Sequence, residues 1–184
     1  MSPRAKLVAI AALFAAPIVA SIVAYNVIEA KPTGNYGELL LPPARVTAQR
    51  LGALGGAEFS FGDLAGKWVM VVSDSGECPM TCREKLEAIR QVRLALGRNA
   101  PRVERVFVVD DVRTREPQVP AEFEGTRVAL TPTGLTLPPG AGNDRAHIYL
   151  VDPRGNVMMR WPAGADRKRM LGDMQRLLKA SQIG

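Results

Sequence analysis

Both cysteines of the 184-residue sequence lie in one stretch, Ser73-Asp74-Ser75-Gly76-Glu77-Cys78-Pro79-Met80-Thr81-Cys82. The segment before this stretch, 67–72, is apolar and β-branched, which predicts a buried strand. The segment after it, 83–96, has apolar residues at helical spacing and is followed by Gly97, which predicts a helix. We therefore expect the two thiols on a turn that leads from a strand into a helix.

The start of this helix has two candidate positions. Thr81 with Glu84 fits a capping box, whereas Cys78 followed by Pro79 fits a helix whose first residue is proline. Either start places a thiol near the amino end of a helix, where the helix dipole and free N–H groups favour the thiolate. A disulfide across so short a loop adds little stability, so we interpret Cys78 and Cys82 as functional thiols. A purely structural disulfide is the alternative.

The N-terminal part of the sequence is the most apolar. Residues 7–28 contain no charged residue, and as a helix they would extend about 33 Å, enough to cross a bilayer. We interpret them as an uncleaved transmembrane anchor, with a cleaved signal peptide as the alternative. The expected organisation is a cytoplasmic tail at 1–6, the anchor at 7–28, a Pro/Gly-containing tether at 29–54 and one domain at 55–184. The domain is expected outside, because a two-cysteine site suits a compartment that manages thiol redox state.

The distribution of charge argues against nucleic-acid binding. The sequence has 24 Lys and Arg residues and 18 Asp and Glu residues, which gives a net charge of +6. Apart from the run 167–169 the basic residues are scattered, and few aromatic residues stand between them. Nucleic-acid-binding proteins concentrate basic residues on one face or place stacking aromatics among them. We expect instead a solvated surface of mixed charge, with some attraction to anionic lipid headgroups.

The remaining segments predict an α/β domain built around the cysteine turn. Strands are expected at 59–61, 102–110, 127–130 and 146–151, a hairpin partner at 157–161, and a C-terminal helix at 166–180. Residues 112–125 and 131–142 contain several prolines or glycines and are expected to be irregular. Strand, thiol turn, helix, strand, irregular link, hairpin and helix is the order of a thioredoxin-like domain. Such a domain has a central mixed sheet flanked by helices.

Three motifs in this domain carry a resemblance to a known family. Cys78-Pro79-Met80-Thr81-Cys82 has the form C-P-x-x-C, with three residues between the thiols. Val109-Asp110 with Arg113 has the form V-D-x-x-R, and residues 148–155 are similar to a Y-L-I-D-P-x-G hairpin. Together with the anchor, these motifs resemble those of the Sco/SenC proteins, which are membrane-tethered thioredoxin-fold factors for cytochrome c oxidase biogenesis.

The resemblance implies a function and a set of metal ligands. The protein would be a factor for respiratory cytochrome c oxidase assembly, single-pass in a bacterial inner membrane, with its domain in the periplasm. It would handle copper, or the thiol redox state of the copper site, through Cys78 and Cys82. Its partner would be an oxidase subunit or another assembly factor.

The third copper ligand implied by the resemblance is a histidine. In the family this histidine stands six residues before the hairpin tyrosine, and the same count from Tyr149 leads to Asn143. The one histidine of this sequence is His147, so the implied ligand set is Cys78, Cys82 and His147. An ordinary strand histidine is the alternative for His147.

Two further functions are compatible with the sequence. A membrane-tethered thiol:disulfide oxidoreductase would attack a partner disulfide with Cys78 and resolve the mixed disulfide with Cys82. The other function is that of a scaffold that kept the fold and only part of the chemistry. Met80 can offer a thioether ligand or fill an apolar gap, and Asp110 and Asp111 can carry protons or lie in solvent. The sequence therefore leaves open whether the protein is an enzyme.

Overall fold

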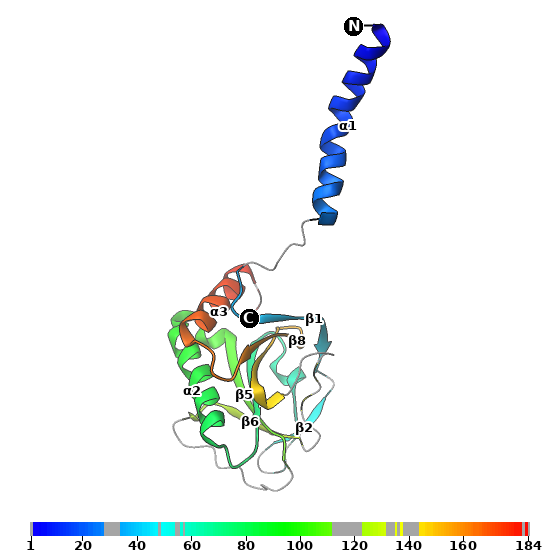
Figure 1. The fold of residues 1–184 in the computed structure, drawn as a ribbon. Coiled ribbons are helices and arrows are strands. Elements are labelled where there is room, and N and C mark those ends of the chain that lie inside the picture. Colours follow the sequence, from blue (N-terminus) through cyan, green and yellow to red (C-terminus); the bar gives the residue numbers. More distant parts are fainter. Residues whose placement is uncertain are drawn as a thin grey trace. The chain divides into compact units, whose positions relative to one another are not determined.

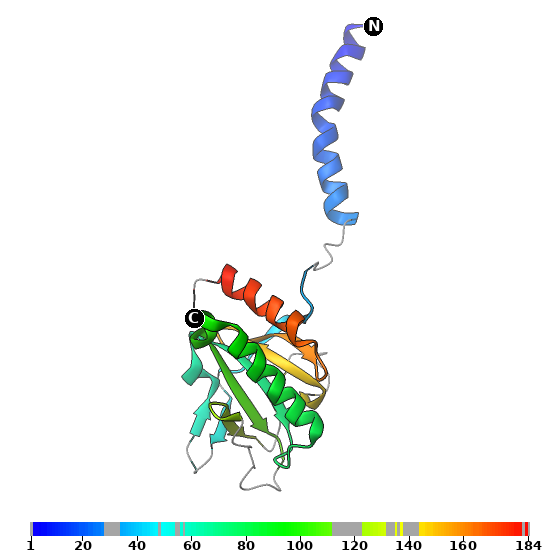
Figure 2. The same cartoon turned by 90° about the vertical axis from the view of Figure 1, so that its left-hand side faces the viewer.

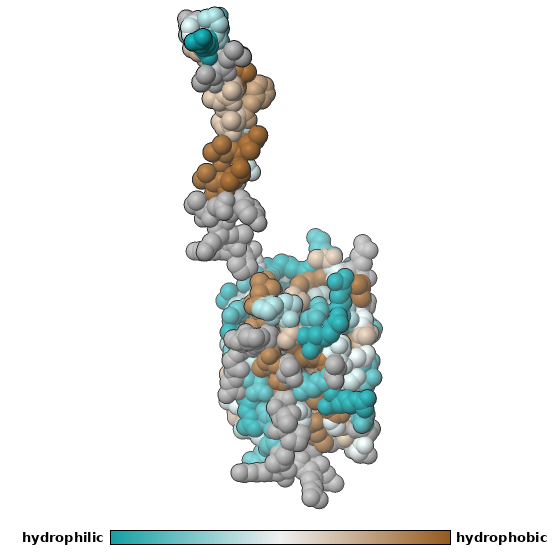
Figure 3. Space-filling view, turned by 90° about the vertical axis from the view of Figure 1, so that its right-hand side faces the viewer, coloured by the Kyte–Doolittle hydropathy of each residue, from teal (hydrophilic) through white to brown (hydrophobic). Residues whose placement is uncertain are grey.

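The chain comprises two units, residues 1–35 and 36–184, which are described separately. The computed structural model describes residues 2–27, 34–47, 49–53, 56, 58–111, 123–131, 135, 137, 144–181 and 183. The first unit contains the helix α1 (Pro3–Val27), of which residues 3–23 are long and apolar enough to cross a membrane (Figure 1). Figure 3 shows hydrophilic residues at its first turn and hydrophobic residues further along. The role of 7–28 as an anchor stays a prediction.

An eight-stranded mixed sheet forms the centre of the second unit, as far as the structure describes it. Its strands are β1 (Glu38–Arg45), β2 (Arg50–Ala53), β3 (Glu58–Ser60), β4 (Trp68–Asp74), β5 (Val103–Val109), β6 (Arg127–Leu130), β7 (His147–Val151) and β8 (Asn156–Pro162). The strand order is β1-β8-β7-β4-β5-β6-β2-β3. β4, β5 and β6 pair in parallel, whereas β7 is antiparallel to β4 and to β8. β4 is buried along its whole length, which agrees with the apolar run 68–72, and its last two residues, Ser73 and Asp74, are buried polar residues.

Two helices cover one face of this sheet, α2 (Met80–Ala95) and α3 (Arg167–Ala180) (Figure 2). Successive residues of a strand point to opposite faces, so each central strand contributes to two apolar clusters. Met70 and Val72 of β4 pack with the helices, and Val69 and Val71 pack on the other face. Within the described residues, short 3-10 turns are η2 (Phe61–Leu64), η3 (Gly97–Arg102) and η5 (Asp144–Ala146).

Most of the predicted elements are present, with small shifts at their ends. The segments predicted around the cysteine turn correspond to β4, α2 and β5, and the later ones to β6, β7, β8 and α3. The short strand predicted at 59–61 is β3 at Glu58–Ser60, because Phe61 begins a 3-10 turn. Most of 112–125 and 131–142, for which irregular structure is predicted, lies outside the described residues.

The segment 29–54, predicted as a tether, contributes two strands. β1 pairs with β8, and β2 pairs with both β3 and β6. The side chains of Leu40 and Leu51 are buried against the sheet, and the compact unit begins at Tyr36. Pro42 and Pro43 favour a loop when the sequence is analysed alone. An edge strand such as β1 tolerates proline, because it needs ladder hydrogen bonds on one side only.

Candidate functional site

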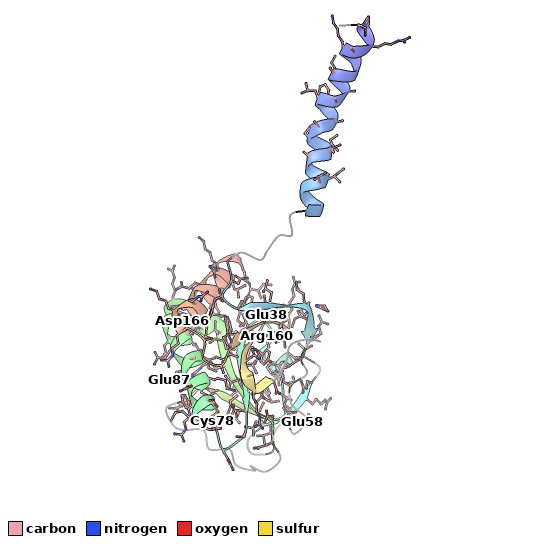
Figure 4. All side chains as sticks on the ribbon, viewed as in Figure 1. Glu38, Glu58, Cys78, Glu87, Arg160 and Asp166 are labelled. Carbon is pink, nitrogen blue, oxygen red and sulfur yellow. A yellow bond between two sulfur atoms is a disulfide. The ribbon has the colours of Figure 1, made fainter. Side chains whose placement is uncertain are left out.

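Cys78 lies on the turn between β4 and α2, and Cys82 lies at the start of α2. β4 ends at Asp74 and α2 begins at Met80, so the predicted strand-to-helix turn is present. Cys78 and Cys82 form a disulfide (Figure 4). Their residues are 2% and 0% exposed and belong to the apolar cluster between the sheet and the helices. The disulfide is therefore buried on the helix-covered side of the sheet.

The backbone of this turn differs from both helix starts that the sequence predicts. Cys78 has φ of +44°, in the left-handed region that non-glycine residues rarely adopt, and its N–H donates to the carbonyl oxygen of Ser75 at 3.1 Å. Pro79 is the N-cap and offers no side-chain acceptor, so neither the capping box nor a proline at the first helical position forms. The left-handed residue turns the chain so that the helix begins after Pro79. Cys82 then lies in the first turn of α2, beside N–H groups that the helix leaves free.

A buried ion pair lies one helical turn from Cys82. Lys85 is fully buried, and its Nζ is 2.8 Å from Oδ2 of Asp74. The same Nζ donates to the carbonyl oxygens of Ser73 at 2.9 Å and Arg145 at 2.6 Å. A buried ammonium group is stable only when it is paired and hydrogen-bonded, which these three acceptors achieve. Lys85 thus joins the end of β4, the first turns of α2 and η5.

The sequence contains a signal for this lysine outside the cysteine motif. Lys85 occupies a position on the apolar side of the helix, with Cys82, Leu86 and Ile89. A charged residue at a core position of an amphipathic helix indicates a buried partner, because an unpaired buried charge is strongly unfavourable. The identity of that partner depends on which strand end faces the helix, and this is a tertiary property.

Asp110 and Asp111 bind other parts of the site. Oδ2 of Asp110 accepts a hydrogen bond from the hydroxyl of Ser73 at 3.1 Å, and both of its oxygens accept from Nε of Arg145 at 3.1 and 2.9 Å. The pKa of Arg145 is raised, chiefly by its hydrogen bond with Asp110. Oδ1 of Asp111 accepts from the N–H of Gly76 at 3.4 Å. These two carboxylates, predicted to carry protons or to lie in solvent, hold the residues that flank the disulfide.

His147 lies on the other side of the sheet from the disulfide. It is the first residue of β7, and its ring centroid is 5.9 Å from that of Tyr149. Burial, the largest cause, raises the pKa of Tyr149 to about 12. Tyr149 belongs to the cluster on the face without helices, whereas Ile148 shares a cluster with Cys78 and Cys82. The structure thus brings the two cysteines together but not His147.

Among the described residues, no three His, Cys, Asp or Glu side chains are grouped closely enough to hold a metal ion. Arg113 and Asn143, which the family resemblance also uses, lie outside the described residues.

An open groove of about 350 Å³ borders the turn on the solvent side of α2. It is lined by Met80, Arg83, Glu84, Glu87, Arg90 and Phe123. Met80 is 70% exposed, so it does not fill a gap in the core. It is instead a large exposed apolar side chain between the two cysteines in the sequence.

Comparison with solved structures places this fold among Sco proteins. ScoI of Bradyrhizobium japonicum with copper bound is 19% identical (TM-score 0.56), and the match covers 73% of this chain and 100% of that one. The apo Sco1 protein from Thermus thermophilus is 20% identical (TM-score 0.60; coverage 79% and 98%). BsSco, a Sco-family cytochrome c oxidase assembly protein with an identified disulfide switch, is 13% identical (TM-score 0.51; coverage 75% and 96%). At these identities the similarity establishes the fold, and the predicted Sco/SenC-like thioredoxin fold is confirmed.

A family comparison agrees with this fold. No curated protein matches the sequence. A family model described as "Transmembrane-like, thioredoxin-like, C-terminal domain" matches residues 68–181, from the start of β4 to the residue after α3. The match includes the disulfide turn, the buried ion pair and both helices of the sheet. The chain therefore belongs to this transmembrane-like, thioredoxin-like family.

Proposed function

We propose that this protein is a membrane-anchored, Sco-like factor in the assembly of a respiratory cytochrome c oxidase, and that it acts by thiol–disulfide exchange. The observation that carries the proposal is the Cys78–Cys82 disulfide at the amino end of α2, together with the position of His147 on the other face of the sheet. This arrangement suits a two-sulfur redox site better than a three-ligand metal site. The disulfide switch identified in BsSco supports a redox role on this fold.

The exchange follows from the positions of the two sulfurs. A partner thiolate attacks Sγ of Cys78, the bond between the two sulfurs breaks, and the electron pair remains on Cys82 as a thiolate. Cys82 is the better leaving group because it lies in the first turn of α2, where free N–H groups stabilise negative charge. A second partner thiolate then attacks the mixed disulfide and leaves the partner oxidised. Two electrons pass to this protein, and the reverse sequence reduces the partner.

Access to the sulfurs requires a local opening of the turn, because both cysteines are buried. The exposed side chain of Met80 lies between them in the sequence and lines the adjacent groove, so it offers the first contact to an incoming protein. The partner in this proposal is an oxidase subunit or another assembly factor with a pair of cysteines. Whether such exchange is catalytic or stoichiometric depends on how the protein is re-oxidised or re-reduced.

Copper transfer is the second candidate function, and the copper-bound ScoI of the same fold favours it. Once the disulfide is reduced, Cys78 and Cys82 supply two soft thiolates, the ligand type that suits Cu(I). We propose that copper, where it binds, is a cargo held by these two sulfurs. His147 could join them only after β7 or the segment before it rearranges.

The proposed location is a bacterial inner membrane. α1 crosses it once, the short tail lies in the cytoplasm and the domain faces the periplasm, where disulfides persist. The length and apolar character of α1 support the anchor.

The test uses the full-length protein in mild detergent and a peptide with two cysteines. The wild type should exchange one disulfide per chain with the reduced peptide. Cys82→Ser should accumulate a mixed disulfide at Cys78 with the oxidised peptide, and Cys78→Ser should form far less of it, measured by mass spectrometry. In a parallel anaerobic Cu(I) titration of reduced protein, His147→Ala should change affinity by less than about twofold. A tight copper site that collapses in His147→Ala would overturn the redox proposal in favour of a three-ligand metal site.

A further inference from the structure

All exposed charged residues within α3 are basic, and the exposed carboxylate of Asp166 caps its amino end. Its exposed charged residues are Arg167, Lys168, Arg169, Arg176 and Lys179. Asp173, the one acidic residue within the helix, is fully buried. Lys168 and Lys179 lie on the side opposite the core positions Met170 and Met174, as the helical period requires. Lys168, Arg169, Arg176 and Lys179 are called the basic face below.

Little within the described structure neutralises the basic face. The guanidinium of Arg169 lies 4.0 Å from the centre of the Tyr36 ring, which carries no charge. Arg176 donates to Asp173, yet its side chain remains 55% exposed. Neither Lys168 nor Lys179 has a carboxylate partner in the described part of the chain. Concentrated, uncompensated cations of this kind attract an anionic surface.

The basic face lies where the domain begins. Asp173 accepts hydrogen bonds from the N–H groups of Tyr36 at 2.9 Å and Gly37 at 2.7 Å, and the hydroxyl of Tyr36 accepts from the N–H of Asp166 at 3.1 Å. These bonds hold the first residues of the unit against α3. Residues 28–35 connect Val27 to Tyr36, and these nine residue steps span at most about 32 Å in any conformation. The connection along the chain between the predicted anchor and the start of this unit is therefore short.

The disulfide turn lies at the other end of the parallel strands. Glu77 and Asp111 flank it, at the carboxyl ends of β4 and β5. The carboxyl end of α3 is instead held by Arg102, which donates to the carbonyl oxygen of Leu178 at 2.9 Å and immediately precedes β5. β4 and β5 pair in parallel over their seven residues, a length of about 23 Å. Figure 4 likewise shows Cys78 well apart from Asp166, at the start of α3.

We propose that the basic face of α3 binds the anionic headgroups of the bilayer that α1 crosses. This inference rests on the membrane anchor of the proposed function. Basic clusters next to an anchor are attracted to anionic lipid, and salt weakens the attraction. Because the disulfide turn lies at the opposite end of the parallel strands, this contact would direct the disulfide away from the membrane surface. The occupant of this surface is therefore lipid rather than protein.

The experiment places a fluorophore on the basic face of the full-length chain. Gln175 is exposed and lies between the two lysines, so Gln175→Cys provides a labelling site while Cys78 and Cys82 remain in their buried disulfide. The labelled protein is reconstituted in phosphatidylcholine vesicles that carry a nitroxide on a minority of headgroups, with or without phosphatidylglycerol. Quenching should be at least about threefold greater with phosphatidylglycerol and should fall to the neutral-lipid level in high salt.

Charge variants separate a local contact from a general charge effect. Lys168→Glu with Lys179→Glu should remove the difference between the two lipids. Arg50→Glu with Arg127→Glu changes the net charge equally on exposed residues of β2 and β6, toward the other edge of the sheet, and should preserve the difference. Loss of the difference in this control pair as well would contradict a contact through α3.

The remaining outcomes distinguish this inference from the proposed function. If the chain floats with the vesicles after a carbonate wash but quenching is equal in both lipids, the lipid contact alone is overturned. This result is expected if the basic face binds an acidic protein partner instead. A chain that does not float with the vesicles overturns the anchor and the lipid contact together. Disulfide exchange, measured separately in detergent, depends on neither result.

Discussion

Two fully buried charged side chains on the helix-covered side of the sheet, Lys85 and Asp173, hold different parts of the domain. Lys85 bonds to Asp74 and to two backbone carbonyls, and so joins the segments that surround the disulfide. Asp173 accepts from two backbone N–H groups and from the indole N–H of Trp161, and so holds the first residues of the domain. A buried charge in this fold therefore marks a junction of distant segments. Of these two junctions, only the one at Lys85 lies next to the disulfide, so only that one is expected to affect thiol exchange.

Removal of Lys85 should produce the largest effect. Lys85→Met leaves the carboxylate of Asp74 buried without its cation, which should lower the free energy of unfolding by about 4 kcal/mol. Denaturant titration of the full-length protein in mild detergent measures this loss. Disulfide exchange should change too, because the same lysine fixes the segments next to Cys82. If the double variant Asp74→Asn/Lys85→Met is no more stable than Lys85→Met alone, Asp74 and Lys85 do not act as a pair.

Asp173→Asn should cause the next largest loss in the free energy of unfolding, about 3 kcal/mol. The substitution replaces two oxygens that accept several N–H groups with one oxygen and an amide donor. Disulfide exchange should stay at the wild-type rate, and this is the contrast with Lys85. A change in exchange as large as that of Lys85→Met would remove the distinction between the two junctions.

The stabilising effect of Asp173 should also depend on pH. Burial raises the pKa of this carboxyl, but hydrogen bonds from Trp161, Tyr36, Gly37 and Arg176 outweigh burial and leave its pKa lowered. A lowered pKa means that the stabilisation is present above the unfolded value of about 3.9 and is lost as the pH falls through the folded value. The stability difference between wild type and Asp173→Asn should therefore shrink below about pH 4, as urea titrations at several pH values would reveal.

A smaller loss is expected from Gly37→Ala, which tests how tightly the start of the domain is packed. A Cβ on Gly37 would lie 2.6 Å from Sδ of Met159 and from Nε1 of Trp161, so we expect a loss of about 2 kcal/mol in thermal or denaturant unfolding. Gly172→Ala in α3 is the matched control, since its Cβ meets nothing within 4 Å. That change should instead raise stability by about 0.5–1 kcal/mol through helix propensity. A neutral Gly37→Ala would show that this junction adapts easily.

The smallest effect is expected at the surface. Arg50 and Glu58 form an ion pair of 3.3 Å, but their side chains are 82% and 76% exposed. Arg50→Met should therefore change unfolding free energy by no more than about 0.5 kcal/mol, because water screens the charges. A loss of stability as large as that of Lys85→Met would mean that burial does not explain why the two ion pairs differ in their contribution to stability.

Local patterns in the sequence were sufficient for the thiol turn and the fold class. The apolar run of β4, the helical spacing of α2 and the two cysteines are neighbours along the chain, so their order predicts their placement. The alternation and hairpin signals of β7 and β8 are local in the same way. The exact start of α2 was not predictable, because the left-handed backbone of Cys78 is set by the disulfide turn as a whole rather than by capping preferences.

Contacts between segments that are distant in the sequence decided the features of the site and the sheet that local patterns could not predict. Lys85 and Arg145 are 60 positions apart, and Asp173 and Gly37 are 136 apart, so no periodicity or motif links either pair. The edge position of β1 makes its prolines acceptable, and only the strand order reveals that position. The side of the sheet to which His147 points depends on the register of β7 against β4, and a shift of one residue would reverse it. The sequence by itself determined that two sulfurs meet on a strand-to-helix turn; the tertiary structure alone decided which charged groups and which face of the sheet accompany them.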